Sequence, residues 1–507
     1  MLDPTRHPSR PIPHAISIPG PGRSLPDPGT VPGVAEHDAI VVGSGPNGLV
    51  AAVTLAAAGW KVLVLEAAQR PGGGTRSAEL IRPGVVHDVC SAIHPLGIAS
   101  PALRELPLQA HGLEWVHPEL PLAHPLDGGR AALQHRCVGD TAAALGADAA
   151  AYRRLYGPLA DAGFDLTDGV LSPLRVPPKH PVALARFGLL GLRSAAGLAR
   201  RRFEGVEAQA LLAGLGAHSV LSLSTPLTAA YGLMLGTLGH TVGWPVARGG
   251  SQRIADALVS LLVERGGRVE CGVRVGSLDE LAPSRAVLLD VSPRQAVAIA
   301  GHRLPRRYVE RLCRFRHGPG VFKLDWVLDG PVPWTNPDVA RAASVHVGGS
   351  LEQIAAAEDE VARGRIPERP FVLLAQPSAF DPTRARGGEH VLWGYCHVPA
   401  RSGVDMTAAI EAQIERFAPG FRDRVVGRHA MGPAALEDHD ANLVGGDVTG
   451  GAGDLRQVFA RPTLGLHPWA TPVRGLYLCS ASTPPGGGVH GMCGWHAANE
   501  VLRRHPD

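Results

Sequence analysis

Two glycine-rich turns lie near the start of the chain, and their spacing is suited to holding phosphate groups. The first, "GSGPNG", places Gly43, Gly45 and Gly48 in a GxGxxG pattern after the apolar run 39–42. The first glycine permits a tight turn, the second lets a pyrophosphate approach the backbone, and the third lets a helix pack on the strand. The start of that helix presents N–H groups and positive potential to an anion, so the pattern indicates a dinucleotide site.

The elements needed to position this turn follow in order. Residues 49–58 predict a helix that stops at Gly59, and residues 61–65 predict a second strand that ends at Glu66. A carboxylate at this place can accept hydrogen bonds from both hydroxyls of an adenosine ribose, and it disfavours the 2′-phosphate of NADP. The sequence therefore predicts a Rossmann-like unit.

The second turn, "RPGGGTRS" at residues 70–77, separates FAD from NAD. A second glycine cluster lets the chain follow the middle of a longer cofactor, and Arg70 or Arg76 can reach a phosphate. An ordinary surface loop is the alternative. The pattern favours FAD, because nicotinamide enzymes have no need of this turn.

A third glycine turn lies at the far end of the chain. Residues 473–482 predict a strand, "TPPGGGVHG" a turn, and residues 492–504 a helix that ends in arginines. The turn lacks GxGxxG, so no second nucleotide is expected. A helix start aimed at the N1–C2=O edge of a flavin would stabilise negative charge on the reduced ring. The alternative is a terminal helix that only packs on the sheet.

These stretches together resemble the phytoene desaturase-like flavoproteins, a branch of the FAD-containing amine oxidase and carotenoid desaturase superfamily. Further similar pieces are "GWPVARGGSQRIADAL", "PGVFKLDW" and "NLVGGDVTGG". The resemblance implies one non-covalently bound FAD and an α/β fold, with a split Rossmann-like FAD-binding domain and an inserted mixed α+β substrate domain.

The resemblance also implies roles for individual residues. Those expected at the pyrophosphate are Gly43, Ser44, Gly45, Asn47 and Gly48, with Glu66 at the ribose. Those expected at the middle of the cofactor are Gly73, Gly74, Thr75 and Arg76, with Val275 at the adenine. Those expected near the flavin ring are Ser480, Gly487, Gly488, Val489, His490 and Gly491. The chain departs from its relatives at Pro484, where carotenoid desaturases carry histidine, and near Ala481, where amine oxidases carry an acid.

Three side chains are candidates for catalysis. His490 follows the third turn and titrates near neutrality, although it could instead cap the helix. Lys323 lies with Asp325 on one face of an alternating strand, where it could orient water or dioxygen; a salt-bridged surface lysine is the alternative. His94 follows the second turn.

Length and composition set the domain plan and exclude other classes. A chain of 507 residues predicts two domains. The predicted parts are a Pro-rich disordered leader at 1–36, an FAD-binding domain at 37–110, 245–300 and 455–507, and a substrate domain at 111–244 and 301–454. A net charge of +3 argues against a nucleic-acid partner. Seven cysteines without a CxxC pair indicate a reducing cytoplasm and no metal site.

Two stretches of the predicted substrate domain bear on its ligand. Residues 208–247 contain no Asp, Glu, Lys or Arg, which favours apolar helices around a hydrophobic substrate, with ordinary core packing as the alternative. Proline and histidines interrupt the stretch, so a membrane span is disfavoured. Residues 169–203 carry seven basic residues and no acid, with Arg186, Arg193 and Arg200 evenly spaced. This composition leaves a membrane-surface helix or a plain solvated helix open.

The leading prediction is an FAD-dependent desaturase or oxidase that removes hydride from a hydrophobic, isoprenoid-like or other apolar small molecule. With no second GxGxxG, the expected electron acceptor is dioxygen or a quinone. A redox-neutral isomerase and a non-catalytic flavoprotein are the alternatives. The expected location is the cytoplasm, with peripheral membrane contact left open.

Overall fold

The fold is built around a parallel five-stranded sheet. The computed structural model describes residues 37–173 and 178–506, so the predicted leader at 1–36 lies outside the described residues. In spatial order the strands are β16 (Leu476–Leu478), β10 (Ala286–Leu289), β1 (Ala39–Val42), β2 (Val62–Glu66) and β9 (Arg268–Cys271). All neighbouring pairs are parallel. The apolar run of β1 is buried throughout, as expected for a central parallel strand, and the α/β class is confirmed.

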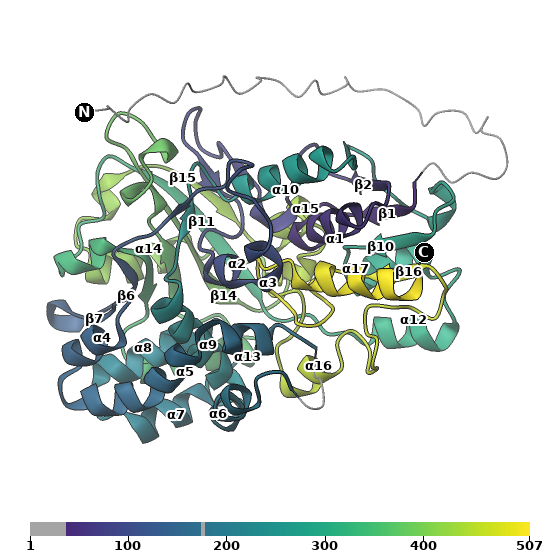
Figure 1. Ribbon diagram of the computed structural model, residues 1–507. Coiled ribbons are helices and arrows are strands. Elements are labelled where there is room, and N and C mark those ends of the chain that lie inside the picture. The colour runs from purple at the N-terminus through teal and green to yellow at the C-terminus, as the bar shows by residue number, and fades with distance from the viewer. Residues whose placement is uncertain (1–36, 174–177, 507) are drawn as a thin grey trace, which may run out of the picture. The chain divides into compact units, whose positions relative to one another are not determined.

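Three helices lie against this sheet: α1 (Pro46–Ala57), α10 (Gln252–Glu264) and α17 (Met492–Arg504). The C-terminal helix α17 runs along α1, although the two are far apart in sequence (Figure 1). A Cβ at Gly494 would lie 1.8 Å from the backbone oxygen of Asn47, so only glycine permits this approach. The bounds predicted for the last helix are confirmed.

The strand before that helix is shorter than predicted. Residues 473–482 read as a strand, but only Leu476–Leu478 pair with β10. Gly475 has a φ of 79°, which bends the chain just before the strand. After it the chain turns, because the amide of Thr483 donates to the carbonyl of Ser480.

A second sheet of seven strands supplies the opposite part of the molecule. In spatial order the strands are β15 (Val425–Met431), β11 (Gly320–Leu328), β14 (His390–Val398), β13 (Val372–Ala375), β12 (Ala342–Val347), β6 (Leu120–Leu126) and β7 (Arg130–Gln134). Only the pair β12–β6 is parallel. Side chains of β11 alternate, so Leu324 and Trp326 pack with helix α14 (Thr407–Phe417), while Lys323 projects to the other face.

Apolar helices accompany the second sheet: α5 (Ala149–Val170), α6 (Pro181–Gly191), α7 (Ala195–Arg202), α8 (Val206–Ala217) and α9 (Thr228–Thr241). The regular spacing of arginines in 169–203 had suggested one continuous helix, and this interpretation is wrong. Arg186 lies on α6 and Arg200 on α7, and the two helices meet at 95°. The bend arises because α6 ends at Gly191 and the hydroxyl of Ser194 accepts a hydrogen bond from the amide of Gly197 to begin α7.

The other elements are shorter or peripheral to the cavity. The remaining strands are β3 (Ser77–Ala78), β4 (His87–Asp88), β5 (Trp115–Val116) and β8 (Val246–Ala247). The remaining helices are α2 (Pro95–Ala99), α3 (Pro101–Arg104), α4 (Val138–Ala144), α11 (Pro293–Ala300), α12 (Arg306–Cys313), α13 (Leu351–Ala362), α15 (Pro433–His439) and α16 (Leu455–Phe459).

The helices of residues 37–173 and 178–506 are mostly short. No single helix there is both long and apolar enough to cross a bilayer, and only the bent pair α6 and α7 passes the test when the two helices are taken together. The predicted domain boundaries remain a prediction.

Candidate functional site

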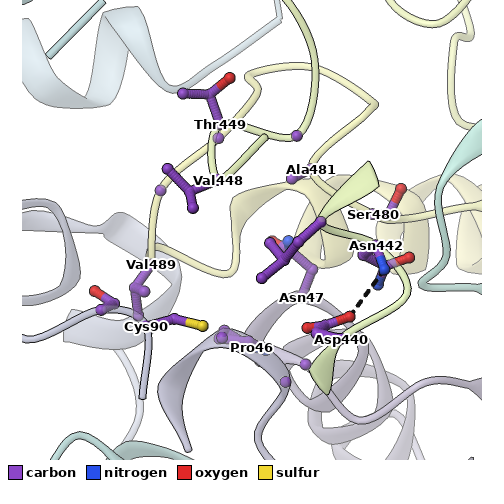
Figure 2. Close-up of a pocket in the computed structure, with 18 of the residues that line it drawn as sticks. Pro46, Asn47, Cys90, Asp440, Asn442, Val448, Thr449, Ser480, Ala481 and Val489 are labelled. Atoms are coloured by element: carbon purple, nitrogen blue, oxygen red, sulfur yellow. Dashed lines mark hydrogen bonds between the residues drawn. The ribbon is translucent and has the colours of Figure 1, made fainter. Parts of the chain in front are cut away.

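One cavity of about 780 Å³ is bounded by residues of both sheets. Figure 2 shows part of its lining, with Pro46 and Asn47 from the first glycine turn facing Val489 from the last. The predicted residues that line it are Gly43, Ser44, Gly45, Asn47, Glu66, Gly73, Gly74, Arg76, His94, Val275, Lys323, Ser480, Gly487, Gly488 and Val489. The predicted residues outside the lining are Gly48, Thr75, His490 and Gly491. The structure thus brings all three glycine turns to one space.

The first glycine turn is held by backbone contacts. Gly43 has a φ of 101°, and a Cβ at Gly48 would lie 2.2 Å from the carbonyl oxygen of Gly43. The amide of Gly48 donates to Oδ2 of Asp290 at 2.8 Å. Gly48 therefore packs against Gly43 and Asp290 on the side of the turn away from the cavity. Gly43, Ser44 and Gly45 form the cavity wall.

Glu66 ties the end of β2 to the first turn. Its Oε2 accepts from the amide of Ser44 at 2.9 Å and from the Ser44 hydroxyl at 2.5 Å, and its Oε1 accepts from the amide of Ala68 at 2.8 Å. A carboxylate offers about four acceptor positions, so capacity remains for ribose hydroxyls. Glu66 lines the cavity, as a ribose-binding residue must.

The second glycine turn folds back onto the first. A Cβ at Gly73 would lie 3.0 Å from the Cα of Gly45, so the two turns touch. Arg76 lines the cavity, and its guanidinium donates to the carbonyls of Gly73 at 3.1 Å and His439 at 2.5 Å. The Thr75 hydroxyl instead donates to the carbonyl of Gly72. Arg70 is exposed and does not line the cavity, so of the two candidate arginines the structure brings only Arg76 to the site.

Two acids beside the turns were missed from the sequence: Asp290, which is buried, and Asp440, which is partly buried. Burial raises the pKa of Asp290 to about 8, and the negative charges of Asp440 and Glu66 add to this rise. Burial also raises the pKa of Asp440, whose Oδ1 accepts from the amide of Asn442 at 3.0 Å (Figure 2). Asp290 follows β10 at the carboxyl edge of the parallel sheet, where ligands of such sheets bind, and that rule could have found it.

The third glycine turn contributes backbone to the cavity, whereas its histidine faces away. Gly487, Gly488 and Val489 line the cavity. His490 is buried behind them, and its Nδ1 accepts from the amide of Met492 at 3.0 Å at the start of α17. Burial lowers the pKa of His490 to about 4. This geometry corresponds to the helix-capping alternative rather than to acid–base work. Gly491 has a φ of 67° and joins the turn to α17.

Lys323 is placed differently from its expected surface position. It is 2% exposed, lines the cavity and forms an ion pair with Asp325. Its ammonium lies 5.8 Å from the ring centre of Trp393, another lining residue. The salt bridge matches the alternative given above, but the burial of Lys323 was not expected, because the alternating pattern of β11 shows which residues share a face without showing what covers that face.

The hydrogen bonds of His94 determine its tautomer. Its Nε2 lies 2.8 Å from Oγ of Ser251, and that hydroxyl donates its own hydrogen to the carbonyl of Ser91 at 2.6 Å. Nε2 must therefore carry the ring proton, which leaves Nδ1 as a buried acceptor with no partner in the described residues. Burial lowers the pKa of His94 to about 4, so the ring is neutral near pH 7.

The remaining wall is mainly apolar. It includes Ala230, Met234 and Leu235 of α9, followed by Trp244. The charge-free stretch 208–247 thus lines the cavity and also packs in the core. Polar residues that the sequence did not single out also line this wall, among them Tyr231, Tyr395, Arg461 and His218. Nε2 of His218 lies 3.0 Å from Nε2 of buried His346. Burial lowers the pKa of His218 to about 3.

Within 37–173 and 178–506, no group of three or more His, Cys, Asp or Glu side chains could hold a metal ion.

Comparison with known proteins agrees with this geometry. Residues 41–106 match the family described as an NAD(P)-binding Rossmann-like domain. The chain is 28% identical to the rat pyridine nucleotide-disulfide oxidoreductase domain-containing protein 2, covering 92% of this chain and 94% of that protein. It is 26% identical to the neurosporene-forming phytoene desaturase of Rhodobacter capsulatus, covering 90% and 92% of the two chains.

Solved structures share the fold across nearly the whole chain. An oxidoreductase from Methanosarcina mazei has a TM-score of 0.63 at 16% identity, covering 92% of this chain and 99% of that one. A putrescine oxidase bearing two substitutions has a TM-score of 0.61 at 19% identity, with the same coverage.

The glycine turns, the parallel sheet and these relatives together define an FAD-type oxidoreductase. Within that class, the chain is similar along most of its length to named phytoene desaturases and dehydrogenases.

Proposed function

We propose that the protein binds one FAD along the three glycine turns and uses it to remove hydride from an apolar small molecule. Electrons then pass to dioxygen or a quinone. The observation that carries the proposal is the continuity of the cavity, because the turns at Gly45 and Gly488 and the apolar helix α9 line the same space.

The residues around the turns fit FAD in shape and chemistry. A Cβ at Gly45 would lie 2.9 Å from Oδ2 of Asp290, so this position requires glycine. Without a side chain here, a pyrophosphate can approach the backbone closely. The positive end of the α1 dipole lies at this turn, and Arg76 adds a positive charge beside it. Glu66 would hold the ribose and Val275 the adenine end. Oδ1 of Asn47 is buried without a partner in the described residues, as expected of a group that awaits a ligand.

FAD supplies the hydride-accepting atom, so the protein must place a C–H bond and exclude water. The apolar wall of Met234, Leu235 and Trp244 can do both for a substrate without charges. Lys323 is held in place by Asp325, and its positive charge can orient water or dioxygen at the cavity wall. His94 lines the cavity and has an Nδ1 that is unpaired within the described residues, which can accept a hydrogen bond from the substrate; its lowered pKa makes it a weak base.

Purified protein provides the test. We expect a yellow holoprotein whose flavin absorbance bleaches anaerobically when a suitable hydrophobic compound is added, and returns when air is admitted. Product masses two hydrogens lower than the substrate support desaturation. A protein that purifies without flavin and takes none up would contradict the proposal.

The same experiment separates the alternatives. A product of unchanged mass indicates a redox-neutral isomerase. If a broad set of hydrophobic compounds never bleaches the flavin, the protein acts as a non-catalytic flavoprotein partner. Tight binding of an apolar compound without bleaching would favour the non-catalytic flavoprotein.

A further inference from the structure

An apolar and basic surface surrounds one side of the cavity, and we propose that it binds an anionic lipid bilayer. This surface, called the rim below, consists of residues 178–193, which include α6, and residues 455–467, which include α16. Seven of the eleven large apolar side chains exposed in residues 37–173 and 178–506 lie on it. They are Val182, Leu189, Leu192, Leu455, Phe459, Leu464 and Leu466. Such clustering is unusual on a surface that meets only water.

Helix α6 is apolar on both of its sides. Val182 and Leu189 are seven residues apart, so they lie on the same face, and Leu189 is 74% exposed. Phe187 lies on the other side and lines the cavity. A helix covered by protein on one side and water on the other should carry polar residues outward, so the outer face of α6 is suited to a second apolar environment.

The second segment of the rim has the same character. Leu464 and Leu466 lie beyond α16, and Leu466 is 92% exposed. Val458, within α16, lines the cavity. Each segment of the rim therefore contains both a residue that lines the cavity and apolar side chains that are exposed.

Contacts with α9 place the two segments beside each other. A Cβ at Gly191, the end of α6, would lie 3.1 Å from the Cβ of Ala230. A Cβ at Gly453, just before α16, would lie 2.4 Å from the hydroxyl oxygen of Tyr231. Ala230 and Tyr231 are consecutive, and both line the cavity. Figure 1 shows α6 and α16 at the same lower edge of the molecule.

The charge of the rim selects an anionic surface. Neither segment contains Asp or Glu, while Lys179, Arg186, Arg193 and Arg456 are exposed. Arg186 and Arg193 form no ion pair with any described residue. The acids that approach the rim are each paired: Asp165 with His180, Glu500 with His467, and Asp454, which caps the start of α16, with Arg316. Basic side chains beside apolar ones favour lipid bilayers that carry negative headgroups.

A bilayer at the rim would place a lipid-dissolved compound next to the cavity wall. This route for the substrate rests on the proposed function, whereas bilayer binding itself requires no turnover. The two ideas can therefore fail separately.

Sedimentation of full-length holoprotein with lipid vesicles tests the proposal. We expect binding to vesicles of phosphatidylcholine with phosphatidylglycerol, weaker binding to phosphatidylcholine alone, and release as salt is raised. Leu189→Gln with Leu466→Gln should weaken binding by about tenfold or more, because two exposed apolar side chains no longer enter the lipid. Arg186→Gln with Arg193→Gln should weaken binding only to the anionic vesicles.

Val404→Gln with Val426→Gln is the matched control, because both valines are exposed and lie outside the rim. This pair should bind vesicles like the unchanged protein. Absence of binding to either vesicle, or equal losses in the rim and control variants, would overturn the proposal. So would size-exclusion chromatography that shows a lipid-free dimer converted to a monomer by the rim substitutions, since the rim would then join two copies. If the protein binds vesicles but no compound bleaches its flavin, the lipid-binding role of the rim is supported and the proposed function is contradicted.

Discussion

The two walls of the cavity are built by different means. At the cofactor wall, polar groups come from short loops: backbone amides, the glycine turns and the carboxylate of Glu66. At the substrate wall, apolar side chains of α9 meet buried polar groups that pair with one another, as in Lys323 with Asp325 and His218 with His346. The cofactor wall depends on the local conformation of the backbone. The substrate wall depends on which side chains, far apart in sequence, come into contact.

This difference explains which substitutions each wall should tolerate. A backbone-built wall is sensitive to any added Cβ and less sensitive to side-chain chemistry. A side-chain wall tolerates paired changes that keep its volume, because its buried groups satisfy each other. The predictions below test this contrast in order of decreasing effect.

Gly494→Ala should have the largest effect, because α17 rests on α1 through a backbone contact. The new Cβ would lie 1.8 Å from the Asn47 oxygen, so one helix must move away from the other. We expect a loss of unfolding free energy of about 3 kcal/mol or more and little bound flavin. Thermal unfolding and the ratio of flavin to protein absorbance measure both.

Gly188→Ala is the control for that substitution. Gly188 is also within a helix, and a Cβ there would meet nothing within 4 Å. Its effect should be neutral or stabilising by about 0.5 to 1 kcal/mol. Equal stability and equal flavin content of the two variants would contradict the proposal that packing of α17 on α1 supports the flavin site.

Lys323→Met should be nearly as damaging, since it leaves Asp325 buried without its partner. Breaking a buried pair on one side costs about 3 to 5 kcal/mol. Adding Asp325→Asn should recover most of that loss. If Lys323 also orients the oxidant, the double variant should fold normally but reoxidise its reduced flavin about tenfold more slowly. Normal stability of the single variant would contradict the burial of this pair, and normal reoxidation in the double variant would leave Lys323 a structural role only.

The same contrast accounts for what sequence could predict. The elements around the first turn and the bounds of α17 were predicted because glycine positions and apolar runs are local signals. The burial of Lys323 depends on contacts with distant elements, which no local pattern records. The 95° bend between α6 and α7 did have local signals, Gly191 and the capping residue Ser194, but the even spacing of the arginines was followed instead. His490 was misleading because histidine is a common acid–base catalyst, whereas the Nδ1 of this histidine accepts a hydrogen bond from the amide of Met492.

Asp290 and Asp440 show a related limit at the cofactor wall. The position of Asp290 after β10 is a local signal, but the raised pKa values of both acids depend on burial beside Glu66, which no local pattern records. The backbone of the wall was thus predictable, while the electrostatic potential around it was not.

Asp290→Asn should change how stability depends on pH. The usual pKa of an Asp is 3.8, and in the folded protein that of Asp290 is about 8. Because the folded carboxyl holds its proton more tightly, the associated stability is full below pH of about 4 and is lost as pH rises towards about 8. Asparagine keeps an acceptor for the amide of Gly48 and has no proton to lose.

Urea unfolding of the apoproteins across this pH range measures the effect. We expect the Asn variant to gain stability relative to the unchanged protein as pH rises from about 4 to about 8, by up to about 1.4 kcal/mol for each pH unit. Asp279→Asn is the control, because Arg303 lowers the pKa of this exposed acid and its ionisation is complete well below neutrality. Parallel curves for Asp290→Asn and the unchanged protein would show that Asp290 is ionised in the fold.

Glu66→Gln should have the smallest of these effects and the most local one. The amide keeps one oxygen acceptor but turns a donor towards either Ser44 or Ala68, whose amides both donate to the present carboxylate. We expect FAD to bind about tenfold more weakly, because a hydrogen bond to a charged acceptor is lost. Fluorescence titration of the apoprotein with FAD measures this. Glu270→Gln, on the neighbouring strand, should bind FAD normally because Glu270 pairs with Arg268 away from the turn. At saturating FAD, the rate of anaerobic reduction should be unchanged in Glu66→Gln, since the side chain belongs to the cofactor wall alone; a slower rate would show that the two walls are coupled.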